Sequence, residues 1–264
     1  ASLAMKAERD GDEWIVNGQK VWTTLAHLAS YGLVIARTDP DVPKHRGITA
    51  FIVDMHAPGV EVRPLRQMTG EAEFNEVYLT DVRIPDAMRL DEPGRGWAVS
   101  ITTLMNERVS IGGGTPPRGS GPIGHLVETW KQFGAGNPVA RDSVVRLWAQ
   151  AEVNRLTNLR SAGTPGTEGS VAKLAMAELN KAIYSLAMDL MGPAGSLYDS
   201  YEFIRPSHAL FTDDMHKNFL RARANSIEGG TSEVLRNIIG ERVLGLPGDV
   251  RVDKDQAWKD VPRN

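Results

Sequence analysis

The 264-residue sequence contains no cysteine. This absence excludes disulfide bonds, thiolate nucleophiles, thiolate zinc sites and cysteine-ligated iron–sulfur clusters. Redox chemistry would therefore require a bound cofactor. No two of the six histidines are three or four residues apart, so no helix can present a pair of them to a metal ion. We expect no metal site.

Long apolar runs are also absent. The most apolar early stretch, residues 25–36, contains His27 and Gly32 and is shorter than the ~18 residues that cross a membrane. With 41% hydrophobic and 24% charged residues, the composition is typical of a soluble globular protein, and we expect a cytoplasmic location without membrane contact. A net charge of −3 gives no reason to expect a nucleic-acid partner.

The beginning of the chain predicts a fragment of a longer protein, because Ala1-Ser2-Leu3 lacks an initiator methionine. Charged residues between Lys6 and Asp10 exclude a signal peptide. The length predicts about two domains. Walker A, G-x-S-x-G and H-E-x-x-H motifs do not occur, so P-loop, serine-hydrolase and zinc-protease functions lack support.

Residues 1–93 have the pattern of a β domain. Asn17-Gly18 separates two β-rich runs and is typical of a type I′ turn, so it predicts a hairpin from Trp14 to Trp22. Further strands are predicted at 31–37, 47–55, 59–62 and 74–84. We expect a small antiparallel β-barrel or sandwich.

Residues 94–264 have the pattern of a helical domain, because the apolar residues now recur at helical spacing. Helices are predicted at 97–112, 142–160, 168–191, 213–225 and 232–244, with a loop over 112–122. The predicted fold is therefore of the α+β class, a β domain (1–93) followed by an antiparallel four-helix-type bundle (94–264).

Three places in the sequence are candidates for chemistry. Glu107 shares a helical strip with the small polar residues Ser100 and Thr103, which would leave space for a ligand over its carboxylate. A solvated surface glutamate is the simpler alternative.

The second candidate is the segment from Glu228 to Ser232. Two glycines precede Thr231, a good N-cap, and would expose backbone N–H groups to an anion or a carbonyl oxygen. An ordinary capped loop is the alternative. In the third candidate, strand alternation places Trp22 and Thr24 on one face, where an indole and a hydroxyl can meet a planar ring. A half-buried tryptophan is the alternative there.

Several segments together resemble the acyl-CoA dehydrogenases, and they occur in the order found in that family. They are GDEWIVNGQKVWTT (11–24), GITAFIVDM (47–55), FNEVYLTDVRIP (74–85), GRGWAVSITTLMNERVSIGG (94–113) and IEGGTSEVLRNIIGERVLGLP (227–247). The resemblance implies the middle β domain and the C-terminal helical bundle of the family, without its N-terminal helical domain. It also implies FAD as the cofactor and an acyl-CoA thioester as the substrate, which is oxidised to a trans-2-enoyl-CoA.

The resemblance also assigns roles to individual residues. Cofactor contacts are implied for Trp22, Thr24, Gly192, Gly195 and Thr231. Substrate contacts are implied for Arg108 and Gly229, the latter through its amide at the thioester carbonyl.

Two glutamates compete for the role of the base that removes the α-proton. Many members carry the base directly before a Gly-Thr pair, but here that position is Gly229, with Glu228 one residue earlier. A smaller group, resembling isovaleryl-CoA and long-chain acyl-CoA dehydrogenases, carries it in a Glu-Arg pair that Glu107 and Arg108 match. We therefore predict Glu107 as the base and Glu228 as the second choice.

The resemblance further implies an electron-transferring flavoprotein as the electron acceptor and a homodimer, homotetramer or heterotetramer. Two positions depart from the family pattern of FAD contacts: Trp130 stands where an arginine is usual, and Asp189 where a glutamine is usual. Alternative functions are a flavin oxidase or monooxygenase of the same fold, and a non-catalytic subunit or binding module of a heteromeric dehydrogenase.

Overall fold

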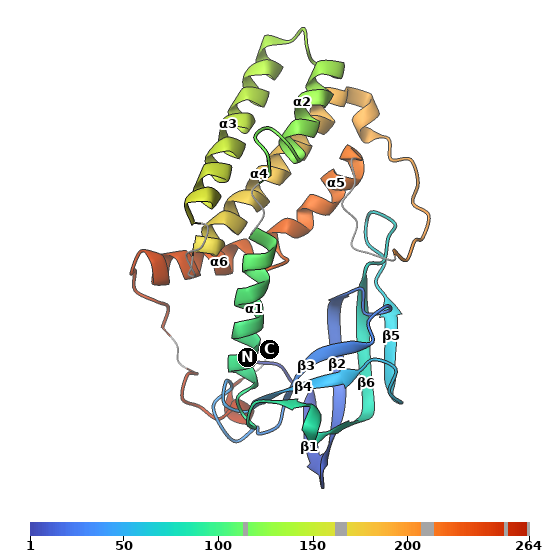
Figure 1. Ribbon diagram of the computed structural model, residues 1–264, viewed down its shortest axis with the longest axis vertical. Coiled ribbons are helices and arrows are strands. Elements are labelled where there is room, and N and C mark those ends of the chain that lie inside the picture. The colour runs from blue at the N-terminus through green and yellow to red at the C-terminus, as the bar shows by residue number, and fades with distance from the viewer. Residues whose placement is uncertain (113–115, 162–167, 207–213, 251–252, 263–264) are drawn as a thin grey trace. The chain divides into compact units, whose positions relative to one another are not determined.

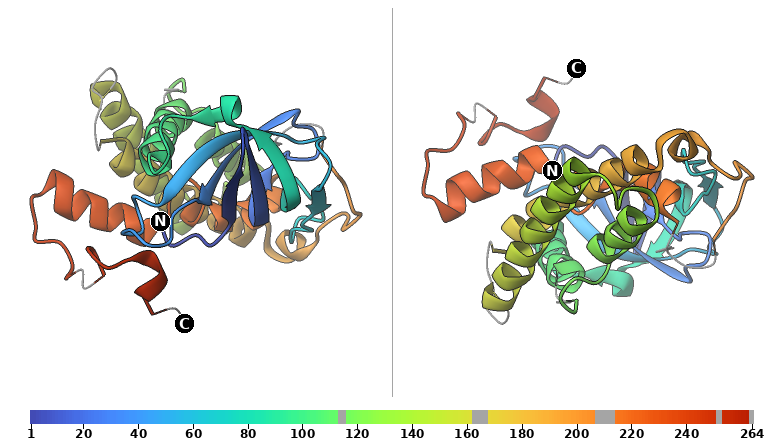
Figure 2. Two further views of the ribbon diagram at one scale, coloured as in Figure 1. Left: turned by 90° about the horizontal axis from the view of Figure 1, so that it is seen from below. Right: turned by 90° about the horizontal axis from the view of Figure 1, so that it is seen from above.

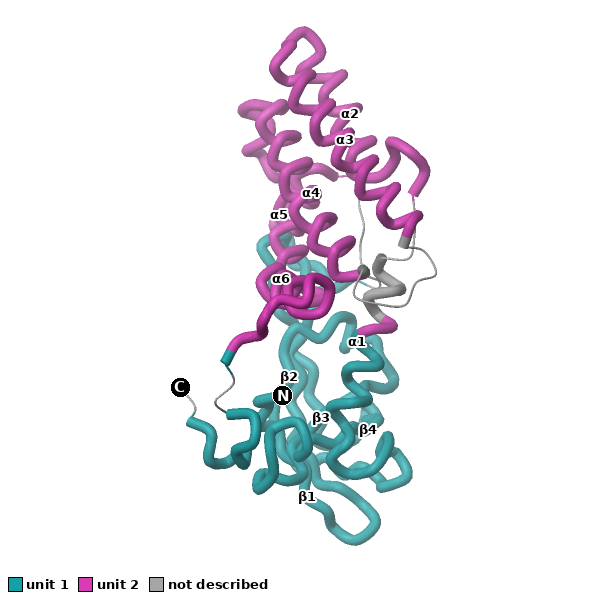
Figure 3. The backbone as a smooth tube through the Cα atoms, turned by 90° about the vertical axis from the view of Figure 1, so that its left-hand side faces the viewer, with its two compact units in different colours: residues 1–104, 202–210, 250–264 teal, residues 105–201, 211–249 magenta. Residues whose placement is uncertain are grey.

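The structure is a computed structural model that describes residues 1–112, 116–161, 168–206, 214–250 and 253–262. It divides the chain into two units (Figure 3). Unit 1 consists of residues 1–104, 202–210 and 250–264, and unit 2 of residues 105–201 and 211–249. The chain passes from unit 1 to unit 2 within helix α1 (Gly96–Gly112).

Unit 1 is built on one seven-stranded sheet (Figure 1). Its strands are β1 (Lys6–Asp10), β2 (Glu13–Thr24), β3 (Tyr31–Arg37), β4 (Ile48–Asp54), β5 (Val60–Pro64), β6 (Phe74–Pro85) and β7 (Arg89–Leu90). They lie in the order β5-β6-β2-β1-β3-β4-β7, and every pair is antiparallel except β1 with β3. Figure 2 shows that the sheet is curved.

Alternation along the strands gives unit 1 its apolar core. Trp14 and Val16 on β2 face the same cluster as Val77 and Leu79 on β6 and the fully buried Phe51 on β4. The first turn of α1 is held against β4, because a Cβ added at Gly96 would lie 2.6 Å from the carbonyl carbon of Thr49. Only glycine permits this close approach of two backbones.

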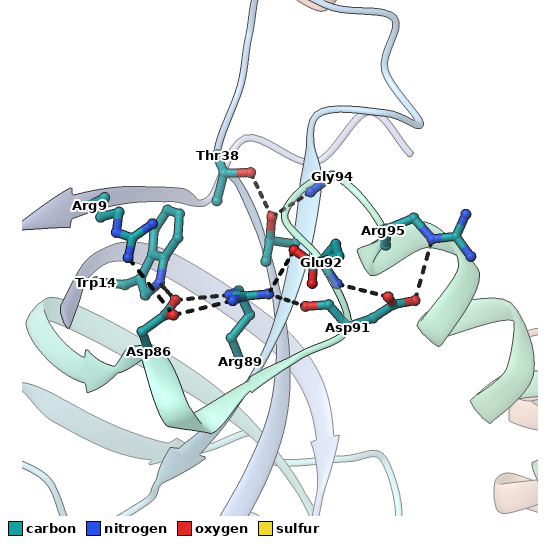
Figure 4. Close-up of polar contacts among 10 residues, drawn as sticks. Arg9, Trp14, Thr38, Asp86, Arg89, Asp91, Glu92, Gly94 and Arg95 are labelled. Atoms are coloured by element: carbon teal, nitrogen blue, oxygen red, sulfur yellow. Dashed lines mark hydrogen bonds and ion pairs between the residues drawn. The ribbon is translucent and has the colours of Figure 1, made fainter. Parts of the chain in front are cut away.

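A polar cluster fixes the chain between β6 and α1 (Figure 4). The carboxylate of Asp86 accepts hydrogen bonds from Arg89 Nε (2.9 Å) and from Trp14 Nε1 (2.7 Å). These bonds hold the pKa of Asp86 well below its ordinary value, the bond from Arg89 having the larger effect. Arg89 also donates to the carbonyl oxygen of Asp91, and Gly94 N donates to Thr49 Oγ1 (3.0 Å). The segment that leads from β6 to α1 is therefore bonded to the sheet at Asp86 and at Gly94.

The predicted hairpin around Asn17-Gly18 is wrong. Both residues lie inside β2, which continues along β6 past a bulge between Val16 and Gly18. The bulge is stabilised across the strands, because Asn17 Nδ2 donates to Asp81 Oδ1 (2.9 Å) and Asp81 N donates to Asn17 Oδ1 (2.9 Å). The tight connection is made earlier, at residues 11–12 between β1 and β2. Asn-Gly supports positive φ at a bulge as well as in a turn, so the dipeptide alone did not distinguish the two.

The C-terminal segment returns to unit 1 and packs on buried Arg37. Residues 257–259 pair with the loop after β3: Trp258 N donates to Val42 O (2.9 Å), and Ala257 bridges Pro43. The indole of Trp258 lies 4.5 Å from the guanidinium carbon of Arg37, which is 3% exposed. The segment ends in the short 3₁₀ helix η5 (Trp258–Asp260).

Unit 2 is helical. It contains the end of α1 with α2 (Pro122–Phe133), α3 (Pro138–Ser161), α4 (Glu168–Met191), α5 (Met215–Arg221) and α6 (Ser232–Ile238). Shorter turns follow three of them: η2 (Gly192–Ser196), η3 (Ala222–Ser226) and the π-helical turn η4 (Ile239–Val243). Helices α2, α3 and α4 lie side by side (Figures 1 and 3), and Leu126, Val144 and Ile183 meet in their shared core.

The α+β class is confirmed, and so are the strands predicted at 31–37, 47–55, 59–62 and 74–84. The helices predicted at 97–112, 142–160 and 168–191 are α1, α3 and α4. Two predicted helices are shorter than expected, because 3₁₀ and π turns follow α5 and α6. Helix α2 was not predicted, and it begins inside the expected loop 112–122, of which 113–115 lie outside the described residues. None of the helices that the structure describes is long and apolar enough to cross a membrane.

Candidate functional site

The segment from Trp22 to Thr24 lies at the end of β2, where a second bulge interrupts the pairing with β6. Trp22 adopts a φ of 61°, which is rare for a bulky side chain and is found where the surroundings enforce it. Its indole is 64% exposed and meets Phe74 edge-on, with 5.8 Å between ring centroids. Because of the bulge, simple alternation no longer relates Trp22 to Thr24. Thr24 is exposed and pairs with Phe74.

A buried asparagine holds this segment in place. Asn75 is fully buried, and its side-chain amide donates to the carbonyl oxygens of Thr23 (3.2 Å) and Glu73 (3.2 Å). Its Oδ1 accepts a hydrogen bond from Arg205 (3.0 Å). Asn75 Nδ2 also lies 3.3 Å from His27 Nδ1. Asn75 therefore fixes the backbone of Thr23, the residue that follows the exposed Trp22, as a rigid binding surface requires.

Burial also affects a titratable group on the same strand. Lys20, two residues before Trp22 on β2, is largely desolvated, which lowers its pKa to about 8. An exposed, rigid indole is a suitable surface for a planar ring system such as a flavin. In this respect the residues of unit 1 fit the cofactor that the sequence implies.

The second candidate segment is the loop from Asn225 to Thr231 in unit 2. Gly229 has a φ of 62° and Gly230 a φ of 102°, conformations that glycine adopts at little cost. Thr231 is the N-cap of α6, and its hydroxyl accepts a hydrogen bond from Val234 N (3.2 Å), as the sequence predicted.

The two glycines carry backbone donors that have no acceptor among the described residues. In the part of the chain that the structure describes, the N–H groups of Gly229 and Gly230 donate to no acceptor. Both residues are partly buried, so unpaired donors here carry a cost unless another molecule accepts from them. Two adjacent donors of this kind suit a carbonyl oxygen or an anion.

Glu228 is engaged within its own loop. Its Oε2 accepts a hydrogen bond from Arg221 Nη2 (2.8 Å), and its Oε1 accepts one from Asn225 Nδ2 (2.7 Å). The side chain is 37% exposed. A carboxylate whose two oxygens accept from a guanidinium and an amide is suited to holding the loop in one shape.

Lys173 binds this loop through its ammonium group. It comes from α4, is 8% exposed, and donates to the carbonyl oxygens of Asn225 (2.7 Å) and Gly230 (2.6 Å). The sequence carries a signal for it: Lys173 shares a helical stripe with buried Ser170 and Ala177, and charged residues are rare in such stripes unless paired. Sequence reasoning missed it, as it missed Phe74 and Asn75.

The remaining predicted residues are placed differently. Gly192 and Gly195 lie in η2, after the C-terminal end of α4, whereas Lys173 lies near its start. The 18 residues of α4 that follow Lys173 correspond to about 27 Å. The structure therefore separates the two glycines from the loop at Gly229. A Cβ at Gly195 would lie 2.4 Å from the carbonyl oxygen of Met188, so close packing is by itself enough to require glycine at this position.

The predicted base and its neighbour lie in α1. The backbones of Glu107 and Arg108 are helical, and their side chains fall outside the described part of the chain. Trp22 and Thr24 belong to unit 1, whereas Glu107, Glu228, Gly229 and Thr231 belong to unit 2. Among the described residues, no group of three His, Asp or Glu side chains is arranged to hold a metal ion.

Comparisons with known proteins agree on one family. Residues 1–82 match the family model "Acyl-CoA dehydrogenase, middle domain", and residues 94–244 match "Acyl-CoA dehydrogenase, C-terminal domain". The acyl-CoA dehydrogenase IpdE1 of Mycobacterium tuberculosis is 38% identical over 256 residues, which are 95% of this chain and 64% of the relative. The chain thus spans somewhat less than two thirds of that relative's length.

Two solved structures are similar over 94% of this chain and 65% of their own. One is the ChsE4-ChsE5 complex from Mycobacterium tuberculosis, with a TM-score of 0.77 and 32% identity. The other is described as the Tcur3481-Tcur3483 steroid ACAD, with a TM-score of 0.76 and 27% identity.

Proposed function

Because the chain belongs to the acyl-CoA dehydrogenase family, we propose that it carries the reacting parts of an FAD-dependent enzyme that oxidises an acyl-CoA thioester to a trans-2-enoyl-CoA. The observation that carries this proposal is the pair of unused N–H donors at Gly229 and Gly230. They have the chemistry that a thioester carbonyl oxygen needs when negative charge develops on it.

In this proposal the residues of unit 2 handle the substrate. The amide of Gly229 binds the thioester oxygen, which makes the C–H bond at the α-carbon more acidic. Glu107 then removes the α-proton. Arg108 adds a positive charge next to the base. Glu228 keeps the loop in shape through Arg221 and Asn225 and takes no proton.

Two residues of unit 1 would contact the flavin ring: Trp22 would pack beside it and Thr24 would donate a hydrogen bond to it. Thr231, Gly192 and Gly195, which belong to unit 2, would contact other parts of an FAD molecule. FAD, when bound, supplies the acceptor for the β-hydrogen. The two domains are proposed at 1–93 and 94–264, although unit 1 of the structure also contains residues 94–104, 202–210 and 250–264.

The assembly and the acyl group are also part of the proposal. We propose a cytoplasmic oligomer that passes its electrons to an electron-transferring flavoprotein. A heteromeric arrangement is supported by similarity to the ChsE4-ChsE5 complex, and a steroid-bearing acyl group by similarity to a structure described as a steroid ACAD.

An anaerobic spectral titration of the complete gene product tests this function. Fatty, branched-chain and steroid side-chain acyl-CoA thioesters are added in turn to the wild type and to Glu107→Gln. We expect one class to bleach the flavin of the wild type. The variant should bind that thioester but reduce about 10²–10⁴ times more slowly, as loss of a general base implies.

Three other outcomes would contradict parts of the proposal. Colourless protein that melts cooperatively would favour a binding module. Equal bleaching rates in wild type and Glu107→Gln would remove Glu107 as the base. Rapid reoxidation of the reduced flavin by air would favour an oxidase or monooxygenase.

A further inference from the structure

The ammonium group of Lys173 is enclosed by the loop that carries the two unused donors. The side chain is 8% exposed, and a buried ammonium is retained in proteins only when it is well paired. Two of its acceptors, Asn225 O and Gly230 O, are five positions apart in the sequence. Glu228 and Gly229 lie between them.

The methylene groups of the same side chain lie close to Gly229, in the middle of the loop. A Cβ built at Gly229 would lie 3.5 Å from Lys173 Cε, in ordinary van der Waals contact. Lys173 therefore binds the loop near its start and near its end, and its Cε lies close to Gly229 between them. Hydrogen bonds from an ionised donor are about twice as strong as neutral ones, so these two bonds are a strong attachment of the loop to α4.

The loop needs such an attachment because its own backbone is permissive. Two consecutive glycines with positive φ have many alternative conformations, and most of them would turn their N–H groups elsewhere. A second bond from α4, between Asn180 Nδ2 and Asn225 Oδ1 (3.3 Å), restrains only the start of the loop. Lys173 is the residue of α4 that restrains both ends.

We infer that Lys173 is a positioning residue for the thioester oxygen, because it holds the loop from Asn225 to Gly230 in the one conformation that leaves the N–H groups of Gly229 and Gly230 available to an acceptor. This inference rests on the proposed function. It assigns to Lys173 no contact with the substrate, only the shape of the loop that makes the contact.

The test compares two ligands that differ only in the oxygen that the loop binds. They are a 2-enoyl-CoA thioester and the matching thioether, in which a methylene replaces the carbonyl. Their dissociation constants are measured by calorimetry on the FAD-loaded complete gene product as wild type, Lys173→Met and Lys181→Met. Lys181 is the matched control, because it lies on the same helix but pairs with Glu178 (3.0 Å).

We expect the wild type to prefer the thioester by about tenfold, the effect of one or two hydrogen bonds to a carbonyl. Lys173→Met should reduce this preference to about twofold or less, while Lys181→Met keeps it. General damage to the protein would weaken both ligands alike and leave the ratio unchanged, so the ratio separates positioning from stability.

Each other result has one meaning. If Lys173→Met retains the wild-type preference, the inference is wrong and the proposed function stands. If the wild type binds neither ligand, the proposed function fails and the inference fails with it. If Lys173→Met does not fold, Lys173→Gln takes its place. Hydrogen exchange of peptides covering residues 225–231 is measured in the same samples, and unchanged protection in the folded variant would also overturn the inference.

Discussion

Replacing Glu228 by glutamine separates the two roles that a glutamate at this position can have. The substitution removes the negative charge that faces Arg221 Nη2 at 2.8 Å but leaves an oxygen to accept from Asn225. A hydrogen bond to a charged group contributes about 1.5–3 kcal/mol when it is fully buried. Because the side chain is 37% exposed, solvent screening reduces the contribution to about 1 kcal/mol or less.

One kcal/mol corresponds to about a fivefold change in a rate or an affinity. We therefore expect Glu228→Gln to slow the anaerobic reduction of the flavin by no more than about fivefold and to lower the melting temperature slightly. Loss of the base itself would slow the reduction about 10²–10⁴-fold. Stopped-flow absorbance with the preferred acyl-CoA distinguishes these values. A decrease above 100-fold at an unchanged melting temperature would refute the reasoning and make Glu228 the base.

Two further predictions concern stability. Hydrogen bonds, chiefly from Arg89, depress the pKa of Asp86 in the folded state, so its stabilising effect is present above the unfolded value near 3.8 and is lost as the pH falls below it. Asp86→Asn should therefore lower the melting temperature at pH 7 and have a smaller effect at pH 3, and an equal effect at both values would contradict this origin. Gly195→Ala places a Cβ 2.4 Å from Met188 O and should cost about 1–3 kcal/mol, or about 2–4 °C per kcal/mol by calorimetry. Gly136→Ala is its control, since a Cβ there meets nothing within 4 Å. Equal melting temperatures of the two variants would show that the end of α4 moves to accommodate the methyl group at little cost.

Regular elements with a clear period were predictable from the sequence. The strand at 31–37 and the helix at 168–191 have the predicted bounds, because alternation and 3.6-residue spacing follow directly from which face is buried. The Asn17-Gly18 bulge was not predictable, since it depends on Asp81, a residue 64 positions away, completing the hydrogen bonds of Asn17. Helix α2 was missed because Pro122, its first residue, was interpreted as part of the glycine-rich loop.

Only those parts of the candidate site that have a local sequence motif were predictable. The loop at Gly229 and its cap at Thr231 have local sequence signals, and the structure places both as the N-cap pattern indicates. The residues that support the loop and the indole are distant in sequence. Lys173 is 52 residues from its partner Asn225, and Asn75 is likewise 52 residues from Thr23. Such contacts follow from tertiary packing, which a single sequence does not encode in any short pattern.

The stacking of Trp258 on Arg37 has a consequence for biosynthesis. Arg37 is the last residue of β3, yet its buried guanidinium meets an indole that lies 221 positions later in the sequence. A ribosome that adds about 5–20 residues per second needs about 10–45 s to synthesise the residues between them. During that interval the face of Arg37 that Trp258 later covers is open to solvent and to chaperones. Unit 1 is thus completed by residues that are translated long after its strands, and a chain that stops before Trp258 would leave this side of Arg37 uncovered.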